Sequence, residues 1–323
     1  MSYRAFLTVS PAPLAILSNR LSTQNRAAAG WLDVIIAGQA WIRRFDIDDI
    51  TAIPGMLAEC AAAGIGTVCV DGGDGTAGLV FSALINGRPY DTPPALALLP
   101  SGKTNMTAEA WSLVGDRREA LAGVIARHAA GTLEQTVHEH PVLAVHEDGR
   151  PARYGAFFGA ADVVDGILYC RRAIYPKGWP NTISHSAAIG VLLWKAMTAG
   201  QKGGVVEVRG KDADDAWQED GRFFVVMATT MSRLLLGLSP QPVIGQGAVQ
   251  YLSLRPGPRA VLSTVPGIVS KRVGPGAART VRRTDTAAFT FAGAYTLDGE
   301  LYEATADKPV TVDGSSTLRF IRW

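Results

Sequence analysis

A strand, a glycine-rich turn and a helix follow one another in TVCVDGGDGTAGLVFSALI, residues 67–85. The glycines of the turn, Gly72, Gly73 and Gly75, allow the backbone to approach a ligand closely and to take positive φ. The helix that follows directs free N–H groups and its positive dipole end at the turn, which makes the turn a natural phosphate site. This segment therefore predicts the strand–turn–helix unit of an α/β fold.

Asp74 lies inside this turn, where a negative charge beside a bound anion would be unfavourable. A divalent cation or an acceptor hydroxyl between the two would remove the conflict, so the combination indicates phosphoryl transfer. Without a ligand the same residues would form an ordinary tight turn, because short glycine motifs often match by chance.

A second loop occurs in ALALLPSGKTNMTAEAW, residues 95–111, and looks at first like the end of a nucleotide-binding P-loop. The P-loop pattern G-x-x-x-x-G-K-[ST] requires its first glycine at position 97 when Gly102 is the second. Ala97 stands there instead, and residues 98–100 are typical of the end of a strand. The loop is therefore not a P-loop.

Strand and helix signals alternate over the first third of the chain, which predicts a parallel sheet covered by helices. From about Leu133 strand signals dominate, and Asp-Gly pairs predict hairpin turns. We expect an α/β nucleotide-binding domain at residues 1–132 and a mainly antiparallel β-sandwich domain at residues 133–323. The expected strands are 14–18, 67–70 and 95–99 in the first part, and strand-like runs follow at 135–148, 153–163, 204–210, 222–230 and 248–254. The expected helices are 26–36, 53–63 (capped by the acids of 46–49), 79–85, a stretch from 104, 183–197 and 260–269, and the expected hairpins lie in 287–304 and 310–322.

The composition limits the partners and the compartment. A net charge of +2 over 323 residues argues against a general nucleic-acid binder. Cys60, Cys69 and Cys170 stand singly in apolar stretches, which favours a reducing, cytoplasmic setting over a disulfide framework or a zinc site. Residues 1–19 show no clear signal-peptide cleavage site, and no apolar run approaches the ~20 residues of a membrane-spanning helix.

VDGGDGT followed by LLPSGKTN resembles the diacylglycerol kinase catalytic-domain family of lipid kinases, which includes bacterial lipid kinases, ceramide kinases and sphingosine kinases. Residues 16–26 (ILSNRLSTQNR) resemble the family's first-strand N-P-x-S-G loop, and residues 295–303 (YTLDGELYE) resemble its late D-G-E motif. The four motifs occur in the family's order over nearly the whole chain. The resemblance implies an α/β domain like that of NAD kinases, followed by a lipid-binding β domain.

The resemblance also implies the residues of the site, with ATP and Mg²⁺ as cofactors. Asp74, Asp298 and Glu300 are the expected catalytic residues, and Asp298 and Glu300 are the expected Mg²⁺ ligands. As a bare pattern the D-G-E hairpin could also be an ordinary turn, and Lys103 could either reach a phosphate or be a surface lysine. The expected nucleotide contacts are Asn19, Ser22 and Arg26 in the first loop, Gly72, Gly73, Gly75 and Thr76 in the second, and Gly102, Lys103, Thr104 and Asn105 in the third.

Several positions depart from the family pattern. The proline and the glycine of the first loop are replaced by Arg20 and Thr23, and Met106 follows Asn105 where an acidic or aromatic residue is common. Residues 245–247 (GQG) lie where many members carry an Asp-Asp-Gly stretch. A structural magnesium site in the β domain is therefore not expected.

These observations predict an ATP-dependent lipid kinase that transfers the γ-phosphoryl group to a hydroxyl of a ceramide, a sphingoid lipid or a diacylglycerol in the interdomain cleft. The departures favour ceramide slightly. The alternatives are an NAD kinase-like enzyme and a non-catalytic lipid-binding protein on the same scaffold. The basic pairs 171–172 and 271–272 beside apolar residues predict reversible, peripheral binding to a membrane surface, while the oligomeric state stays open.

Overall fold

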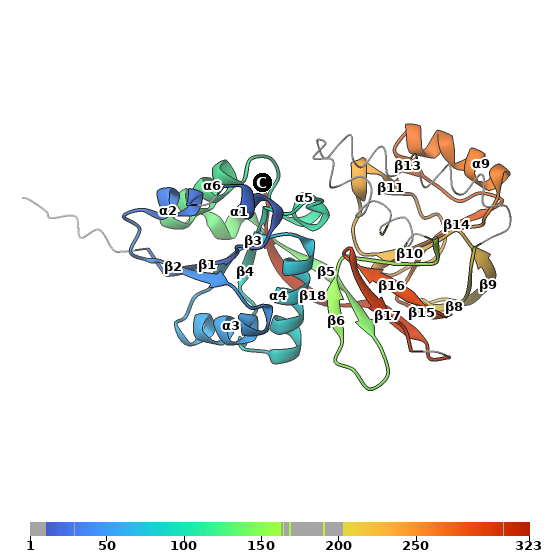
Figure 1. Ribbon diagram of the computed structural model, residues 1–323, viewed down its shortest axis with the longest axis horizontal. Helices are drawn as coiled ribbons and strands as arrows, with labels where there is room; N and C mark the ends of the chain where they lie inside the picture. The colour runs from blue at the N-terminus through green and yellow to red at the C-terminus, as the bar shows by residue number, and fades with distance from the viewer. Residues whose placement is uncertain are drawn as a thin grey trace, which may run out of the picture.

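The computed structural model describes residues 11–28, 30–162, 164, 168, 190, 203–305 and 307–323. Figure 1 shows a helix-covered sheet at the N-terminal side of the molecule and a β-rich part at the other side. The fold class expected from the sequence is confirmed. The helix expected at 183–197 lies outside the described residues except for residue 190, which is helical.

Four parallel strands form the first part of the fold. They are β1 (Leu14–Asn19), β2 (Ile42–Ile47), β3 (Thr67–Gly72) and β4 (Ala95–Pro100), in the spatial order β2-β1-β3-β4. β3 and β4 are buried along their whole length. Such continuous burial explains why their sequences are apolar without alternation, as is typical of parallel strands covered on both faces.

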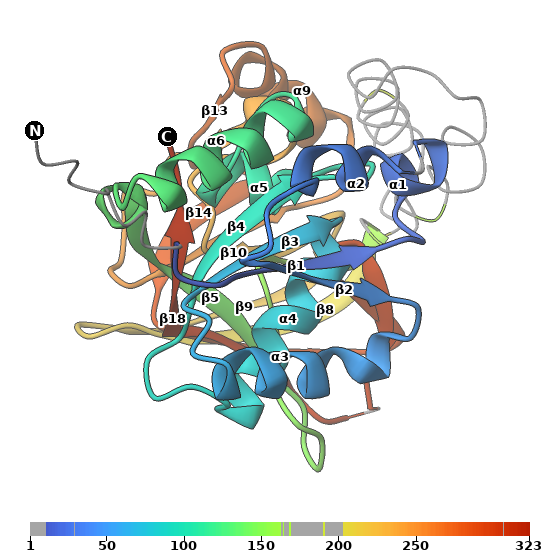
Figure 2. The ribbon, with the colours of Figure 1, turned by 90° about the vertical axis from the view of Figure 1, so that its left-hand side faces the viewer.

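Helices cover both faces of this sheet (Figure 2). On one face Ile53, Leu57 and Phe81 of α3 and α4 form a core with alternate residues of the strands. On the other face Trp31 and Leu121 of α2 and α6 pack on the remaining strand residues. The helices are α1 (Thr23–Ala27), α2 (Trp31–Ile36), α3 (Ile53–Ala62), preceded by the 3₁₀ turn η1 (Ile50–Ala52), α4 (Asp74–Gly87), α5 (Met106–Trp111) and α6 (Arg117–Ala129).

The strand order places a topological switch point between β1 and β3. From β1 the chain moves outward to β2 and then returns to the other side of β1 as β3. The connections that leave the carboxyl ends of β1 and β3 therefore diverge, and ligands of open α/β sheets bind in the crevice that this divergence creates. The loops after β1, β3 and β4 are the three loops singled out by their sequences.

The second part is a sandwich of two sheets. One sheet has the antiparallel order β14-β12-β10-β7-β16-β17. Its inner side chains, such as Phe158 and Tyr251, pack against Val208 and Phe289 of the facing sheet. The strands here are β7 (Phe157–Ala160), β8 (Gly204–Lys211), β9 (Ala216–Phe223), β10 (Val225–Thr229), β12 (Val249–Leu254), β14 (Arg279–Thr284), β15 (Thr286–Phe291), β16 (Ala294–Leu297) and β17 (Glu300–Glu303), with the short β11 (Ser239–Pro240), β13 (Arg272–Val273), 3₁₀ turns η2 (Leu133–Thr136) and η5 (Leu235–Gly237), and helix α9 (Pro258–Val269).

The last strand of the chain connects the two parts. β18 (Val310–Ile321) pairs in parallel with β4 and antiparallel with β5 (Val137–His146) and β15, and β6 (Arg153–Gly155) extends β5. Phe320 of β18 is fully buried and meets Phe81 of α4 edge-on, with 5.6 Å between the ring centroids. The C-terminal residues therefore belong to the core of the N-terminal sheet, while the expected boundary at 132/133 stays a prediction.

Three local expectations were wrong. The helix expected at 26–36 is two short helices, because the chain takes a positive φ of 77° at Gly30. β2 was missed, because its six residues IRRFDI mix charged and apolar residues along one half-exposed edge strand. The hairpin expected at 310–322 is instead one strand, Val310–Ile321, since Asp313 accepts a hydrogen bond from the N–H of Ser315 and accommodates a β-bulge in place of a turn.

We predict that Phe320→Ala lowers the free energy of unfolding by about 3–5 kcal/mol, because it leaves a cavity in the core of the N-terminal sheet. Thr317→Ala, at an exposed position of the same strand, is the matched control and is expected to change that free energy by less than about 0.5 kcal/mol. Chemical denaturation measures both. Equal effects of the two substitutions would show that β18 does not contribute to the core of this sheet.

Candidate nucleotide and phosphoryl-transfer site

Two glycine loops meet at the carboxyl ends of β3 and β4. A Cβ atom built on Gly102 would lie 2.6 Å from the Cα of Gly73, a distance that no side chain can occupy. Asn105 holds this approach in place: its Oδ1 accepts the N–H of Gly102 at 2.7 Å, and its own backbone takes a positive φ of 56°. A void of about 10 Å³ remains beneath the contact, so the loops are packed together and a ligand would lie on them and not between them.

The first loop is bound to both of the others. Asn19 donates its Nδ2 hydrogen to Thr76 Oγ1 at 2.9 Å. Gln24 binds the third loop twice: its backbone N–H donates to Ser101 O at 3.1 Å and its Nε2 donates to Pro100 O at 2.8 Å. The structure therefore brings together the three loops that the sequence marks as nucleotide contacts. The side chain of Asn19 joins the first loop to the second, and that of Asn105 bonds Gly102 within the third.

A buried carboxylate that the sequence analysis missed lies beneath these loops. Asp71, the residue before the first glycine, is fully buried and accepts hydrogen bonds from Ser18 Oγ at 2.6 Å, Asn25 Nδ2 at 2.8 Å and Ser101 Oγ. Arg117 of α6 lies 4.0 Å from the same carboxylate and donates to Asn25 Oδ1. One side chain thus receives hydrogen bonds from the ends of β1 and β4 and fixes all three loops at once.

Asp74 is positioned at the start of α4 and caps a second helix. It accepts the backbone N–H of Thr107 at 2.9 Å and that of Met106 at 3.2 Å, both from the first turn of α5. The residue is buried, and burial raises the pKa of its carboxyl group. Asp74 therefore joins the second and third loops, a structural task that the sequence did not reveal.

The D-G-E hairpin lies against the first turns of α4. A Cβ atom on Gly75 would come within 3.3 Å of Cγ and 3.4 Å of Oε1 of Glu300, and one on Gly78 would lie 3.6 Å from Oδ2 of Asp298. β16 and β17 form the hairpin, with Leu297 opposite Glu300. The fold thus places Glu300 beside Gly75 and Asp298 beside Gly78, although these residues lie far apart in the sequence.

Asp298 lies at the turn of this hairpin in an uncommon backbone state, with φ at 51°. Its Oδ1 accepts the N–H groups of Ala156 and Phe157 at 3.0 and 2.9 Å. Burial, and next the negative charge of Asp74, raise the pKa of Asp298 to about 8. The charge of Asp74 therefore acts on Asp298 across the contact between the two parts of the fold.

The remaining expected contacts differ in burial. Ser22 is buried, and its hydroxyl oxygen makes no hydrogen bond to the described residues. Arg26 lies in α1 with its side chain exposed, while Lys103 and Thr104 are half-buried in the third loop. A buried hydroxyl without a partner beside glycine loops fits a site for phosphate oxygens, because such a group is costly to leave unsatisfied.

The described residues contain no group of three or more His, Cys, Asp and Glu side chains that could hold a metal ion. Near residues 245–247 the carboxylate of Asp212 instead faces the guanidinium of Arg282 at 3.2 Å and accepts the N–H of Asp215 at 2.9 Å. Gln246 donates to Asp214 at 2.7 Å. Around residues 245–247, the carboxylate of Asp212 therefore binds Arg282, and that of Asp214 binds the side-chain amide of Gln246.

Residues 13–134, which contain all three loops, match the family model described as diacylglycerol kinase catalytic domain. These residues belong to the diacylglycerol kinase catalytic-domain family. A search of curated proteins finds no significant match.

Solved structures show the fold of the whole chain. A diacylglycerol kinase from Bacillus anthracis str. Sterne superposes with a TM-score of 0.58 at 13% identity, over 98% of both chains. A second structure from the same organism, provisionally assigned as a diacylglycerol kinase, gives 0.62 at 13% identity with the same coverage. Yeast NADH kinase complexed with NADH gives 0.51 at 9% identity, over 97% of this chain and 84% of that chain.

We predict that Gly102→Ala separates the two glycine loops, because its Cβ would overlap the backbone of Gly73. We expect destabilisation of about 1–3 kcal/mol together with loss of nucleotide binding. Gly55→Ala in α3, where nothing lies within 4 Å of the added Cβ, is the matched control and should raise stability by up to about 1 kcal/mol. Thermal unfolding and nucleotide titration measure the pair. Normal nucleotide affinity in Gly102→Ala would contradict the assigned contact.

We also predict a pH dependence of stability that arises from Asp298. Its folded-state pKa of about 8 lies above the ordinary 3.8, so the folded protein keeps a proton that the unfolded chain has lost. This contribution is complete below pH 4 and is lost as the pH rises through 8. Asp298→Asn should remove that slope, as measured by denaturation at several pH values from 4 to 9. A slope that is unchanged in the variant would assign it to other groups.

Proposed function

We propose that this protein is an ATP-dependent lipid kinase. The observation that supports the proposal most strongly is the contact of Glu300 and Asp298 with Gly75 and Gly78, because it joins carboxylates of the β-rich part to the glycine loop of the catalytic domain. Phosphoryl transfer needs both elements in one place: N–H groups for the phosphates, and hard oxygen ligands or a base near the transferred group.

The three loops would hold the phosphates of ATP. Backbone N–H groups at the start of α4, beside Gly73 and Gly75, supply donors and the positive end of the helix dipole. The unpartnered hydroxyl of Ser22 supplies a further donor from the first loop. Lys103 and Arg26 supply positive charge, and we propose the exposed Arg26 for the outermost phosphate oxygens.

Asp298 is proposed as the base that takes the proton of the acceptor hydroxyl. A pKa of about 8 suits a general base that works near neutral pH. In the transfer, the lipid oxygen forms a bond to the γ-phosphorus, the bond from that phosphorus to the bridging oxygen of ADP breaks, and the hydroxyl proton passes to Asp298. Asp74 acts by holding α5 and the third loop, and its charge raises the proton affinity of Asp298.

Mg²⁺ would neutralise the charge of the phosphates, and Glu300 is the carboxylate proposed to bind it. Sites for nucleotide-bound Mg²⁺ use one or two carboxylates with phosphate oxygens and water, so a dedicated cluster of protein ligands is not required. The position of Glu300 over Gly75 supports this assignment.

The acceptor is proposed to be the hydroxyl of a ceramide, a sphingoid lipid or a diacylglycerol. The family of residues 13–134 favours a lipid over NAD as the acceptor, although a yeast NADH kinase shares the fold. A lipid-binding protein without activity would keep the scaffold and transfer no phosphate. Incubation with γ-labelled ATP, Mg²⁺ and a panel of ceramide, sphingosine, diacylglycerol and NAD distinguishes these functions, and labelled NAD or an absence of label in every lipid would contradict the proposal.

We predict that Asp298→Asn lowers kcat by about 10²–10⁴-fold, the usual contribution of general-base catalysis. In the wild-type protein kcat should rise with pH through about 8, whereas in the variant it should be flat. Glu300→Gln should instead raise the Mg²⁺ concentration needed for half-maximal activity and leave thermal stability nearly unchanged, because Glu300 is exposed. A variant Asp298→Asn that keeps the wild-type kcat and pH profile would exclude this residue as the base.

A further inference from the structure

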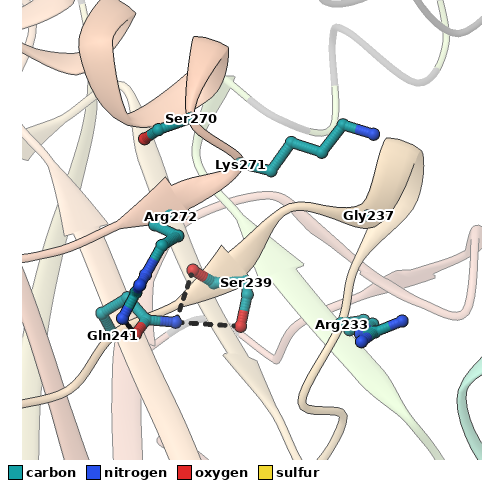
Figure 3. Close-up of a pocket in the computed structure, with 7 residues that line it drawn as sticks. All are labelled: Arg233, Gly237, Ser239, Gln241, Ser270, Lys271 and Arg272. Atoms are coloured by element: carbon teal, nitrogen blue, oxygen red, sulfur yellow. Dashed lines mark hydrogen bonds between the residues drawn. The ribbon is translucent and has the colours of Figure 1, made fainter.

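A second polar hollow lies in the β-rich part, between β11, β13 and the end of α9 (Figure 3). Its volume is about 400 Å³, and none of its lining residues belongs to the glycine loops. Among the described residues, no acidic side chain lines it. The lining side chains are three cations, Arg233, Lys271 and Arg272, together with the polar Ser239, Gln241 and Ser270.

The polar lining is ordered by hydrogen bonds, whereas the positive charges have no acidic partner in the part of the chain that the structure describes. Arg272 donates to Gln241 Oε1 at 3.1 Å, and Gln241 donates to Ser239 Oγ at 3.0 Å. Lys271 extends along Gly237: a Cβ atom built on Gly237 would lie 3.7 Å from Cδ of Lys271. Within the described residues none of the three cations forms an ion pair with a carboxylate, in contrast to Arg255 and Arg282 of the same region. Three such cations around one hollow repel one another unless an anion lies between them.

The backbone at Lys271 is in a strained conformation. Lys271 follows the C-cap of α9 with a positive φ of 58°, and its N–H donates to Ile268 O at 3.1 Å. This position after a helix is usually glycine, because a side chain is strained there. A lysine at a position that favours glycine is consistent with a functional role for its positive charge. Replacing it by glycine removes the charge and at the same time relieves the backbone strain, so an effect on binding can be distinguished from an effect on folding.

An exposed apolar stripe precedes this pocket on α9. The helix buries Ala260, Val261 and Thr264 against the β-rich part. Leu262, Val265 and Val269 follow one another at helical spacing on the opposite side, and they are 59%, 40% and 78% exposed. Val269 directly precedes Ser270 of the pocket, so the stripe and the pocket are continuous along the chain.

The charge of the chain is strongly segregated around these two features. Residues 221–284 contain nine Lys and Arg and no Asp or Glu, whereas the rest of the chain contains 22 Lys and Arg and 29 Asp and Glu. The small net charge of +2 is therefore the sum of a basic segment, residues 221–284, and an acidic rest of the chain. α9 and the pocket both lie inside the basic segment.

We propose that the α9 stripe and the basic pocket form one docking surface for an anionic phospholipid bilayer, with the phosphodiester of a lipid headgroup held by Arg233, Lys271 and Arg272. Leu262, Val265 and Val269 would enter the boundary between headgroups and acyl chains, as the apolar face of an interfacial helix does. The neighbouring cations are attracted to the negative surface. A bilayer has an apolar layer directly beneath a layer of phosphates. The apolar stripe of α9 would meet the first layer and the basic pocket the second. The described residues include no helix long and apolar enough to cross a bilayer.

The surface complements the proposed function, because an enzyme with a lipid acceptor must reach the bilayer, but its test does not depend on that function. Co-sedimentation of the full chain with vesicles is measured without ATP and without an acceptor lipid. We expect binding to vesicles of phosphatidylglycerol and phosphatidylcholine at low salt, and much weaker binding to phosphatidylcholine alone. A protein that phosphorylates lipids and yet does not bind these vesicles would overturn the docking surface and leave the kinase proposal intact.

The triple variant Arg233→Gln, Lys271→Gln, Arg272→Gln should bind the anionic vesicles roughly a hundredfold more weakly, since each basic residue near such a surface contributes about fivefold. The matched control neutralises three exposed arginines outside the basic segment, Arg43→Gln, Arg88→Gln and Arg209→Gln, and should bind nearly as the wild type does. Leu262→Ser with Val269→Ser should weaken binding roughly tenfold through lost apolar contact. Equal weakening in the pocket and control triples would reduce the effect to net charge and overturn the proposal.

Lys271→Gly separates binding from folding. Glycine suits the positive φ, so the melting temperature should be equal to or above that of the wild type, while vesicle binding should fall about fivefold. Inorganic phosphate at millimolar concentration is the second arm. If it displaces the protein no better than sulfate or chloride at equal ionic strength, the headgroup in its bilayer is the ligand; if it abolishes binding to the vesicles selectively, the pocket is a site for free phosphate and the bilayer proposal fails.

Discussion

The close approach of Gly73 and Gly102 is the constraint on which the rest of the site depends. The two backbones meet where any side chain would overlap, and this contact aligns the loops that leave β3 and β4. Asp71 beneath the loops and Asp74 beside them secure the alignment, the first by hydrogen bonds from Ser18, Asn25 and Ser101, the second by capping α5. Buried carboxylates in such positions are costly unless they are fully hydrogen-bonded, which makes the arrangement specific for one geometry of the loops.

The second consequence of this geometry is electrostatic. Capping α5 places the charge of Asp74 close to the D-G-E hairpin, where Asp298 is also partly withdrawn from water. Burial, and next the negative charge of Asp74, make ionisation of Asp298 harder and raise its pKa to about 8. The carboxylate that caps α5 in the N-terminal part, Asp74, thereby raises the proton affinity of Asp298 in the β-rich part. β18 holds the two parts together, because it pairs with β4 in one part and with β15 in the other.

The sequence was informative where local chemistry dictates structure, and less so where distant residues decide. The apolar runs of β3 and β4, the glycines of the loops and the Asp298–Gly299 turn were readable, because each requires particular residue types at fixed spacing. β2 was missed, since an edge strand needs no continuous apolar run. The hairpin expected at 310–322 is the single bulged strand β18, because its partners β4 and β5 lie far away in the chain. The role of Asp71 could have been suspected from its place at the end of a buried strand, but Ser18, Asn25 and Arg117 are brought to it only by the fold. The D-G-E hairpin was located through the resemblance to a family, not through its residues alone.

The central claim is that the loops after β1, β3 and β4 and the hairpin of β16 and β17 form one nucleotide site. Hydrogen exchange followed by mass spectrometry, with and without ATP and Mg²⁺, tests it across the whole chain in a single experiment. The account predicts that ATP with Mg²⁺ slows exchange together in residues 19–26, 72–77, 101–107 and 297–301, and leaves residues 233–241 and 270–272 unchanged. Protection confined to the basic pocket, or protection of the loops without the hairpin, would contradict the claim that these four segments act as one site.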